Sequence, residues 1–323
     1  MTYPPMAATQ PIMTTIDSFL HLPVMPDEAV QALAVKPDGI YVDGTLGGGG
    51  HAALILTRLT TGTLIGIDRD EDALRAVKGR LPNLLTIHGN FHDIPDILYE
   101  RGIERVDGVL LDLGVSSHQL DTPERGFSYR FDGPLDMRMD PSQGRTAADI
   151  VNTCTQGEIT RILYQYGEER YAPRIARAIT KIREVKPIET TRALTETIES
   201  AIPAKARYGD KHPSMRTFMA LRIAVNDELL PLKAAVNRII GHLNPGGRIA
   251  VITFHSLEDR IIKHTFRAAE NPCDCPRDIP YCVCKKQPQL RVITRTPVLP
   301  GTDELARNNR AHSAKLRIAE KII

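Results

Sequence analysis

The hydrophobic and polar positions of this chain follow two alternating periods. Short apolar runs, several of them closed by an acidic residue, occupy residues 40–42, 63–68, 84–88 and 106–112, which suits buried strands. Between them lie longer segments whose apolar residues recur every three or four positions, the spacing of an amphipathic helix. Strands that alternate with helices predict an α/β fold around a mostly parallel sheet.

The alternation stops after Asp112 and resumes near residue 214. The intervening residues contain turn-rich sequence and then helical patterns over 147–200, with no convincing strand. Beyond them, the pattern predicts one long helix over 214–242, a helix from residue 257, and strands over 248–254, 291–294 and 315–318.

These patterns divide the chain into a sheet domain and an insertion. We assign residues 21–125 and 214–323 to the sheet domain and residues 126–213 to a helical insertion. Residues 1–20 are rich in Pro, Thr and Met, and we expect a disordered tail there. A chain of 323 residues is long enough for a large core with such an insertion.

A glycine-rich loop follows the first predicted strand. Residues 43–51 read Asp-Gly-Thr-Leu-Gly-Gly-Gly-Gly-His and lead into an apolar helical pattern. A strand, a glycine loop and a helix form the opening unit of nucleotide-binding sheets. The same residues also fit a dinucleotide fingerprint, with Asp68 at the expected acidic position, so the motif alone does not choose the ligand.

Acidic residues at the strand ends separate the two classes of ligand. Asp43, Asp68 and Asp112 each close a predicted strand, and ligands of open α/β sheets bind at those carboxyl ends. Asp43 beside the glycine loop would repel the pyrophosphate of a nicotinamide dinucleotide. An ammonium group near the loop and a ribose diol further along would instead favour two acids, and S-adenosylmethionine has that shape and charge.

Several further motifs occur in one order along the chain. They are Asp43-Gly-Thr-x-Gly-x-Gly-Gly-His51, Ile67-Asp-Arg-Asp70, Leu111-Asp-Leu-Gly-Val-Ser-Ser117, Glu124-Arg-Gly-Phe-Ser128, Gly133-Pro-Leu-Asp-Met-Arg-Met-Asp140, Tyr166-Gly-Glu-Glu-Arg170 and Thr253-Phe-His-Ser-Leu-Glu-Asp-Arg260. With them the chain resembles the RsmH (MraW) family from His21 onward. The resemblance implies a Rossmann-like class I S-adenosylmethionine-dependent methyltransferase sheet with an inserted all-helical domain. It also implies methylation of N4 of a cytidine in the decoding region (P site) of 16S ribosomal RNA.

The resemblance and the glycine loop together give a set of expected cofactor contacts. The resemblance implies Gly49, Gly50, His51, Asp68, Phe91, Asp112 and Gln119, and the loop itself adds Asp43 and Gly48. A carboxylate at Asp68 suits the ribose hydroxyls, and Phe91 suits stacking on adenine. The ring or backbone N–H of His51 could meet the carboxylate of the methionine moiety.

The chemistry requires a group that accepts a proton from the amine as the methyl arrives. Asp112 is the first candidate, and binding of the cofactor alone is an equally good interpretation of this residue. Ser117 and His255 are further catalytic candidates. Many amino-methyltransferases carry an Asp/Asn/Ser-Pro-Pro-aromatic motif at this strand end, whereas residues 112–115 read Asp-Leu-Gly-Val, so their mechanism does not transfer directly.

The charge pattern adds an RNA partner. The net charge is only +2, so nucleic-acid binding must come from local patches. The spacing of Arg170, Arg174, Arg177 and Lys181 predicts one helix face, with Ile175, Ile179 and Ile182 on the other. Residues 285–323 hold nine Lys or Arg against three Asp or Glu. We therefore expect the insertion to recognise RNA, although a charged stripe is also typical of a solvated helix face.

Two other activities remain open from the residues alone. A methyltransferase acting on another RNA base or on a protein amine would use the same cofactor loop. A nicotinamide-dependent oxidoreductase would fit the literal glycine fingerprint but not Asp43.

Cysteine usage and the N-terminal sequence bear on metal and compartment. Cys273, Cys275, Cys282 and Cys284 could bind zinc, but the C-x-C spacing is tighter than in the usual zinc sites, and we assign no metal. No basic residue precedes Lys36, and no apolar run reaches the roughly 20 residues of a membrane span. We expect a cytoplasmic protein, with the oligomeric state open and a homodimer among the alternatives.

Overall fold

The computed structural model describes residues 23–207, 212–276 and 281–323 of the chain. Within them a seven-stranded sheet has the order β3-β2-β1-β4-β5-β7-β6. Strands β1 to β5 are parallel to one another, and β7 is antiparallel to both β5 and β6. The strands are β1 (Ile40–Asp43), β2 (Thr63–Asp68), β3 (Leu84–His88), β4 (Val106–Asp112), β5 (Leu243–Thr253), β6 (Leu290–Val292) and β7 (Lys315–Lys321). The predicted α/β class is confirmed.

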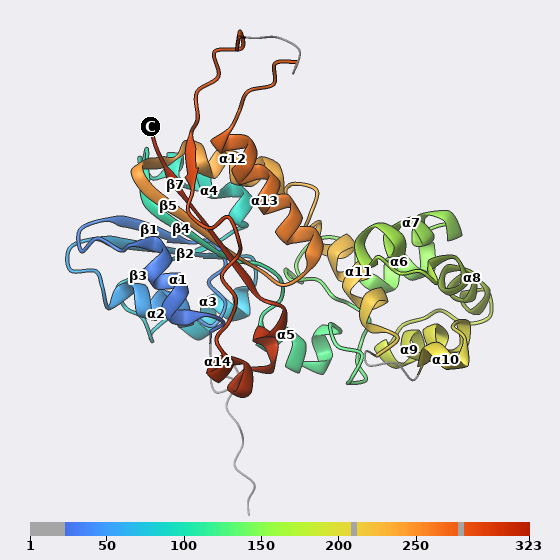
Figure 1. Cartoon of the computed structure of the whole chain (residues 1–323). Helices are drawn as coiled ribbons and strands as arrows, with labels where there is room; N and C mark the ends of the chain where they lie inside the picture. The colour runs from blue at the N-terminus through green and yellow to red at the C-terminus, as the bar shows by residue number, and fades with distance from the viewer. Residues whose placement is uncertain (1–22, 208–211, 277–280) are drawn as a thin grey trace, which may run out of the picture.

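Helices cover both faces of this sheet (Figure 1). One face packs against α4 (Ile94–Glu100), α12 (Leu232–Gly241) and α13 (Ser256–Glu270). The other face packs against α1 (Pro26–Leu33), α2 (Gly50–Leu56) and α3 (Glu71–Val77). The remaining core elements are η2 (Phe91–Asp93), α5 (Ser117–Asp121), η3 (Pro123–Arg125), α14 (Thr302–Arg307) and η4 (Asn309–Ser313). No helix in the described part of the chain is long and apolar enough to cross a membrane.

A second, helical part lies to one side of the sheet (Figure 1). It comprises α6 (Ala147–Thr153), α7 (Gln156–Gly167), α8 (Ala172–Arg183), α9 (Thr191–Ala201) and α10 (Ala204–Arg207). Its apolar side chains form a core of their own, which includes Ile159, Ile175 and Leu194. The helix α11 (Met215–Asn226) joins the two parts, because Phe218 packs into the helical core and Ile223 into the sheet core. Because α11 contributes to both cores, the domain boundary that we expected before residue 214 stays a prediction.

The structure corrects two predicted elements after the insertion. The single helix expected over 214–242 is wrong: α11 ends at a left-handed Asp227, and α12 starts after Pro231. Proline inside a helix removes a backbone donor and clashes with the preceding turn, so a break near Pro231 is favoured. The strand expected from Arg248 begins earlier, at Leu243. Regular pairing with β4 does resume at Arg248, after a bulge.

The tail predicted for residues 1–20 lies outside the described residues.

The turn-rich segment before α6 is held by close backbone contacts at two glycines. A Cβ at Gly126 would lie 2.1 Å from the Pro134 carbonyl oxygen, and one at Gly133 would lie 2.0 Å from the Pro123 carbonyl oxygen. Gly126 also has a φ of +71°, which side-chain-bearing residues rarely adopt. Only glycine fits at these two positions.

Candidate active site

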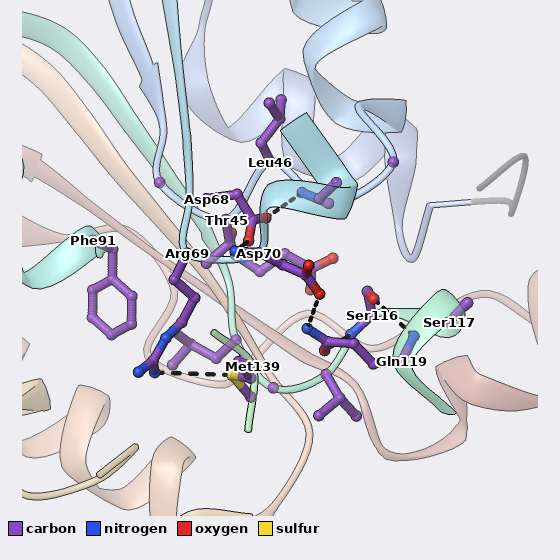
Figure 2. A pocket seen from close by; sticks show the side chains of 18 of the residues that line it. Thr45, Leu46, Asp68, Arg69, Asp70, Phe91, Ser116, Ser117, Gln119 and Met139 are labelled. Carbon is purple, nitrogen blue, oxygen red and sulfur yellow. Dashed lines mark hydrogen bonds between the residues drawn. The ribbon is translucent and has the colours of Figure 1, made fainter. Parts of the chain in front are cut away.

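A cavity of about 190 Å³ opens at the carboxyl ends of the parallel strands (Figure 2). Its walls come from the loops that follow β1, β2, β3 and β4, together with Phe254 and Glu258 after β5. Arg310 from η4 also lines it. The sheet therefore brings together five loops that are far apart in sequence, at the edge where ligands of this fold class bind.

The glycine loop forms one wall of the cavity. Gly47 and Gly49 have φ values of +48° and +74°, and Gly49 is the N-cap of α2. Gly44 has no room for a side chain, because a Cβ there would lie 2.7 Å from Leu111 Cδ2. Of the predicted loop contacts, Gly48, Gly50 and His51 line the cavity, whereas Gly49 faces Val77 and Leu81 instead.

Asp68 connects the glycine loop to the second strand. Its carboxylate accepts the Gly47 N–H at 2.7 Å and the Asp70 N–H at 2.8 Å. Burial raises the pKa of Asp68 to about 6, against the lowering effect of these two hydrogen bonds. The residue lines the cavity, as predicted, and each carboxylate oxygen can accept a further hydrogen bond.

Sequence analysis missed Asp70 and Arg125 as site residues. Asp70 caps α3 and is almost fully buried, and its Oδ2 accepts from Gln119 Nε2 and from Arg125, each at 2.8 Å. Arg125 also donates to the backbone oxygens of Arg138 and Met139. This buried network joins the cavity wall to the segment that leads into the helical part. Gln119, a predicted cofactor contact, lines the cavity. Its side-chain amide already donates to Asp70 and accepts the Ser116 N–H.

Asp43 lies behind the glycine loop, close to the two cavity residues His51 and Asp112. Asp43 is 1% exposed and does not line the cavity; its Oδ1 accepts the Thr45 N–H, and its Oδ2 has no hydrogen-bond partner. Burial, with a smaller contribution from the Asp68 charge, raises the pKa of Asp43 to about 7. His51 Nδ1 lies 3.8 Å from Asp112 Oδ2. Asp43 therefore acts on the cavity through its charge and its hold on the loop, rather than by direct contact.

The ring of His51 is turned towards the protein interior. Its Nε2 lies 2.9 Å from the Val24 carbonyl oxygen, which can only accept, so Nε2 carries the hydrogen. Burial lowers the pKa of His51, so the neutral ring leaves the Nδ1 lone pair facing Asp112. The predicted contact between this ring and a methionine carboxylate is not supported by this geometry, although the residue does line the cavity.

Asp112 ends β4 and faces the cavity. Its Oδ1 is buried without a hydrogen-bond partner, and its backbone N–H donates to Thr45 Oγ1 at 2.6 Å. Burial, followed by the charges of Asp43 and Glu258, raises the pKa of Asp112 well above its usual value. A buried carboxylate of raised pKa with a free oxygen is a suitable proton acceptor.

Glu258 is a further residue that sequence analysis missed. It is 1% exposed, and its Oε2 accepts the Phe254 N–H at 2.8 Å. Burial raises the pKa of Glu258, but the hydrogen bond and charge of His255 and the charge of Arg222 outweigh it and hold the pKa below its usual value. The ionised Glu258 lines the cavity and makes Asp112 harder to ionise.

His255 and Ser117, the other two catalytic candidates, occupy different places. His255 is the N-cap of α13, does not line the cavity, and has its Nε2 3.1 Å from Glu258 Oε1. It therefore positions Glu258. Ser117 is the first residue of α5 and lines the cavity. Phe91 lines the cavity and also packs against the sheet core. Its stacking on adenine stays a prediction.

The predicted RNA-binding residues lie on the helical part. Arg174, Arg177 and Lys181 are exposed on α8, with Ile175 and Ile179 buried beneath them. Arg170 was expected on the same helix face, but it precedes the helix, because α8 begins only at Ala172. Its guanidinium packs over the Tyr171 ring, 5.0 Å from the centroid. Ile182 is also partly exposed rather than buried.

Known sequences and structures provide comparisons for this site. The chain matches the family described as MraW methylase over residues 18–322. It is 54% identical over 308 residues to the "Ribosomal RNA small subunit methyltransferase H" of Carboxydothermus hydrogenoformans, covering 94% of this chain and 98% of that protein. The protein of the same name from Geobacter sp. (strain M21) is 52% identical over 313 residues, covering 95% of this chain and all of the relative.

One of the similar solved structures is an rRNA methylase from Streptococcus thermophilus. It is 12% identical in sequence, with a TM-score of 0.39 over 92% of this chain and 97% of that one. A TM-score of 0.39 is too low to assign a fold by similarity. The fold assignment therefore rests on the strand order and on the sequence relatives.

Proposed function

The chain belongs to the MraW methylase family, and on that premise we propose that it transfers a methyl group from S-adenosylmethionine to N4 of a cytidine in the decoding region (P site) of 16S ribosomal RNA. The match of residues 18–322 to this family, whose relatives are named as ribosomal RNA small subunit methyltransferases, carries the proposal. The choice of N4 and of the P site rests on the motif resemblance.

The cavity suits a positively charged cofactor. Asp68 and Asp112 line the cavity with carboxylates, and Asp43 lies behind it with a buried carboxylate oxygen that has no partner, so the site favours positive charge. Asp68 would accept the ribose hydroxyls, and Phe91 would contact the adenine. When bound, S-adenosylmethionine supplies the electrophilic methyl group of its sulfonium. A dinucleotide pyrophosphate would instead meet the charges of Asp68 and Glu258, which disfavours the nicotinamide alternative.

Asp112 would serve the reaction as the proton acceptor. The lone pair of an exocyclic amine is delocalised into the base, so hydrogen bonding of its N–H to a carboxylate makes the nitrogen a better nucleophile. As the N–C bond forms, the nitrogen becomes acidic, and the Asp112 carboxylate can take the proton. Glu258 and Asp43 raise the proton affinity of Asp112, and the Nδ1 lone pair of His51 lies behind it.

A test of the function uses small ribosomal subunits that lack the modification. We expect incubation with labelled S-adenosylmethionine, nuclease digestion and mass analysis of the nucleosides to place the label in N4-methylcytidine. Label in a different nucleoside would assign the enzyme to another base. Absence of label from RNA, with cofactor binding intact by calorimetry, would contradict the ribosomal assignment and direct the search to protein amines.

The helical part would bind the RNA around the target base. A base inside folded RNA must be unstacked and held, which favours phosphate contacts at a distance from the cavity. Arg174, Arg177 and Lys181 form no ion pair with any described residue, so their charges are available to phosphates. They lie on α8, at the end of the helical part away from the sheet (Figure 1), within reach of a substrate as large as a ribosomal subunit. That substrate also places the protein in the cytoplasm.

The double variant Arg174→Ala/Arg177→Ala is expected to weaken binding of small subunits by about 10-fold at low salt. It should raise KM and leave kcat unchanged, because phosphate contacts act before the chemical step. The slope of log affinity against log salt concentration should fall by about two, one for each lost phosphate contact. Salt-dependent binding and steady-state kinetics with small subunits measure both effects.

A matched pair of arginines provides the control. Arg101 and Arg105 are exposed on the loop between α4 and β4, at the opposite edge of the sheet from the cavity. The variant Arg101→Ala/Arg105→Ala removes the same charge and should bind normally. Equal losses in both variants would indicate a general charge effect, and no loss in either would make the α8 stripe a solvated helix face.

A further inference from the structure

The loop between α13 and β6 carries four cysteines whose sulfur atoms converge. Cys273, Cys275, Cys282 and Cys284 come from the two arms of this loop, and all four Sγ atoms lie within 4.8 Å of one another. Individual Sγ–Sγ distances from Cys282 are 3.6 Å to Cys273, 3.9 Å to Cys275 and 3.5 Å to Cys284. No two of these thiols are bonded as a disulfide.

These separations match one tetrahedral metal ion. Four thiolates at the usual Zn–S distance of about 2.3 Å have sulfur atoms about 3.8 Å apart, close to the distances measured from Cys282. An iron–sulfur cluster would need space between the thiolates for several irons and their bridging sulfides. We propose that Cys273, Cys275, Cys282 and Cys284 bind a single zinc ion. This proposal differs from the expectation drawn from the C-x-C spacing, which was that the chain binds no metal.

A hydrogen bond to one of the sulfurs supports this assignment. The backbone N–H of Val283, the residue between Cys282 and Cys284, points at Cys275 Sγ at 3.3 Å. Backbone donors to a sulfur stabilise the thiolate form that a metal requires. This bond also joins one C-x-C pair to the other, so the backbone is already folded around the site.

Among the residues that the structure describes in this loop, few other contacts hold its two arms together. Tyr281 is 81% exposed and Val283 is 65% exposed, so neither contributes hydrophobic burial. An ion pair of 2.5 Å between Lys286 and Asp274 spans the arms, but exposed ion pairs contribute little. A metal ion would supply the free energy that orders this segment, as it does in small metal-bound domains. Lys285 and Lys286 would offset the negative charge of a zinc ion with four thiolates.

The position of the loop makes the proposed ion structural. Helix α13 begins beside the cavity at Ser256 and runs for 15 residues, about 22 Å, before the loop starts (Figure 1). Four thiolates also fill every position of a tetrahedral zinc ion, which leaves none for a substrate. The proposal is thus independent of the methyltransferase function, and metal content and cofactor binding can succeed or fail separately.

The test is the metal content of the full-length chain, purified under reducing conditions without chelators. We expect elemental analysis to find about one zinc per chain, and less than a tenth of that when all four cysteines are replaced by serine. A cobalt-substituted protein should show the intense visible bands of tetrahedral thiolate coordination. Cys154, the fifth cysteine, is buried in the helical core, so Cys154→Ala should keep the zinc.

Folding of the four-cysteine variant is checked by thermal unfolding and by S-adenosylmethionine binding, both of which should match the wild type. Removing zinc with a chelator should accelerate tryptic cleavage after Lys285 and Lys286 in the wild type and leave the variant unchanged. Wild-type protein that contains no zinc and takes up none when it is added would overturn the proposal. Stoichiometric disulfides between these cysteines in freshly prepared cells, or iron in place of zinc, would overturn it too.

Discussion

Replacing Asp112 by asparagine is expected to lower kcat by about 10²- to 10⁴-fold and to leave the dissociation constant for S-adenosylmethionine within about five-fold. Asparagine keeps the shape of the side chain but cannot take a proton from the amine. The Asp112 carboxylate lines the cavity, so loss of its charge and proton affinity should affect the chemical step. Single-turnover rates on small subunits and calorimetry with the cofactor measure the two quantities separately.

The pH dependence gives a second readout of the same variant. The pKa of Asp112 is raised by burial and by the charges of Asp43 and Glu258, and the reaction needs its charged form. The wild-type rate should therefore fall as the pH is lowered through this pKa, and the acidic limb of the profile should be absent from Asp112→Asn. An Asp112→Asn enzyme with normal kcat and a hundred-fold weaker cofactor affinity would make Asp112 a binding residue only.

The other end of the same strand offers the control. Asp107 accepts hydrogen bonds from Lys36 and from the Ile40 N–H, and it does not line the cavity. Asp107→Asn is therefore expected to keep kcat. A fall in kcat of similar size in both variants would show that disturbance of β4, rather than loss of the proton acceptor, explains the result.

Replacing Asp68 by alanine is expected to weaken S-adenosylmethionine binding by about 100-fold or more. A hydrogen bond to a charged group contributes about 1.5–3 kcal/mol, and this carboxylate would accept two from the ribose. Alanine also frees the N–H groups of Gly47 and Asp70, so the glycine loop loses its link to β2. Asp68→Asn, which keeps one acceptor but no charge, should lose about ten-fold. Calorimetry on both variants, with thermal unfolding to check the fold, measures this series.

The sign of the pH effect on cofactor binding follows from the pKa of Asp68. Burial raises this pKa to about 6, so the carboxylate is charged above pH 6 and neutral below it. A cationic ligand binds the charged form more tightly, so affinity should fall as the pH drops through 6, and binding near pH 6 should release protons. Asp68→Asn should lack this part of the pH dependence. An Asp68→Ala affinity within three-fold of the wild type would remove Asp68 from the cofactor site.

The acidic cavity was predictable because neighbouring parallel strands present the same end of each strand to one edge. Asp43 pairs with Gly66 near the end of β2, and Asp68 pairs with His88 at the end of β3, so acids spaced 25 residues apart in sequence meet in space. The alternating apolar runs fixed the four strands involved. The long helix over 214–242 failed because hydrophobic periodicity continues across the break that Pro231 favours.

The residues that complete the site were outside the reach of sequence patterns. Asp70, Gln119 and Arg125 form a buried network across 49 and 55 residues, and nothing in the local periodicity links them. The roles of Glu258 and His255 likewise depend on how α13 leaves the sheet. The pKa of Glu258 is lowered by the hydrogen bond and charge of His255 and by the charge of Arg222, and these neighbours meet only after the chain has folded.

The sequence by itself determined the α/β class, the glycine loop, the acids at the strand ends and the family, because these depend on local periodicity and on motifs within short segments. Tertiary structure alone decided that Asp43 lies behind the cavity, that the His51 ring faces Asp112, and that four thiols converge within 4.8 Å of one another. Burial, orientation and distance are properties of pairs of segments packed together, and no single segment encodes them.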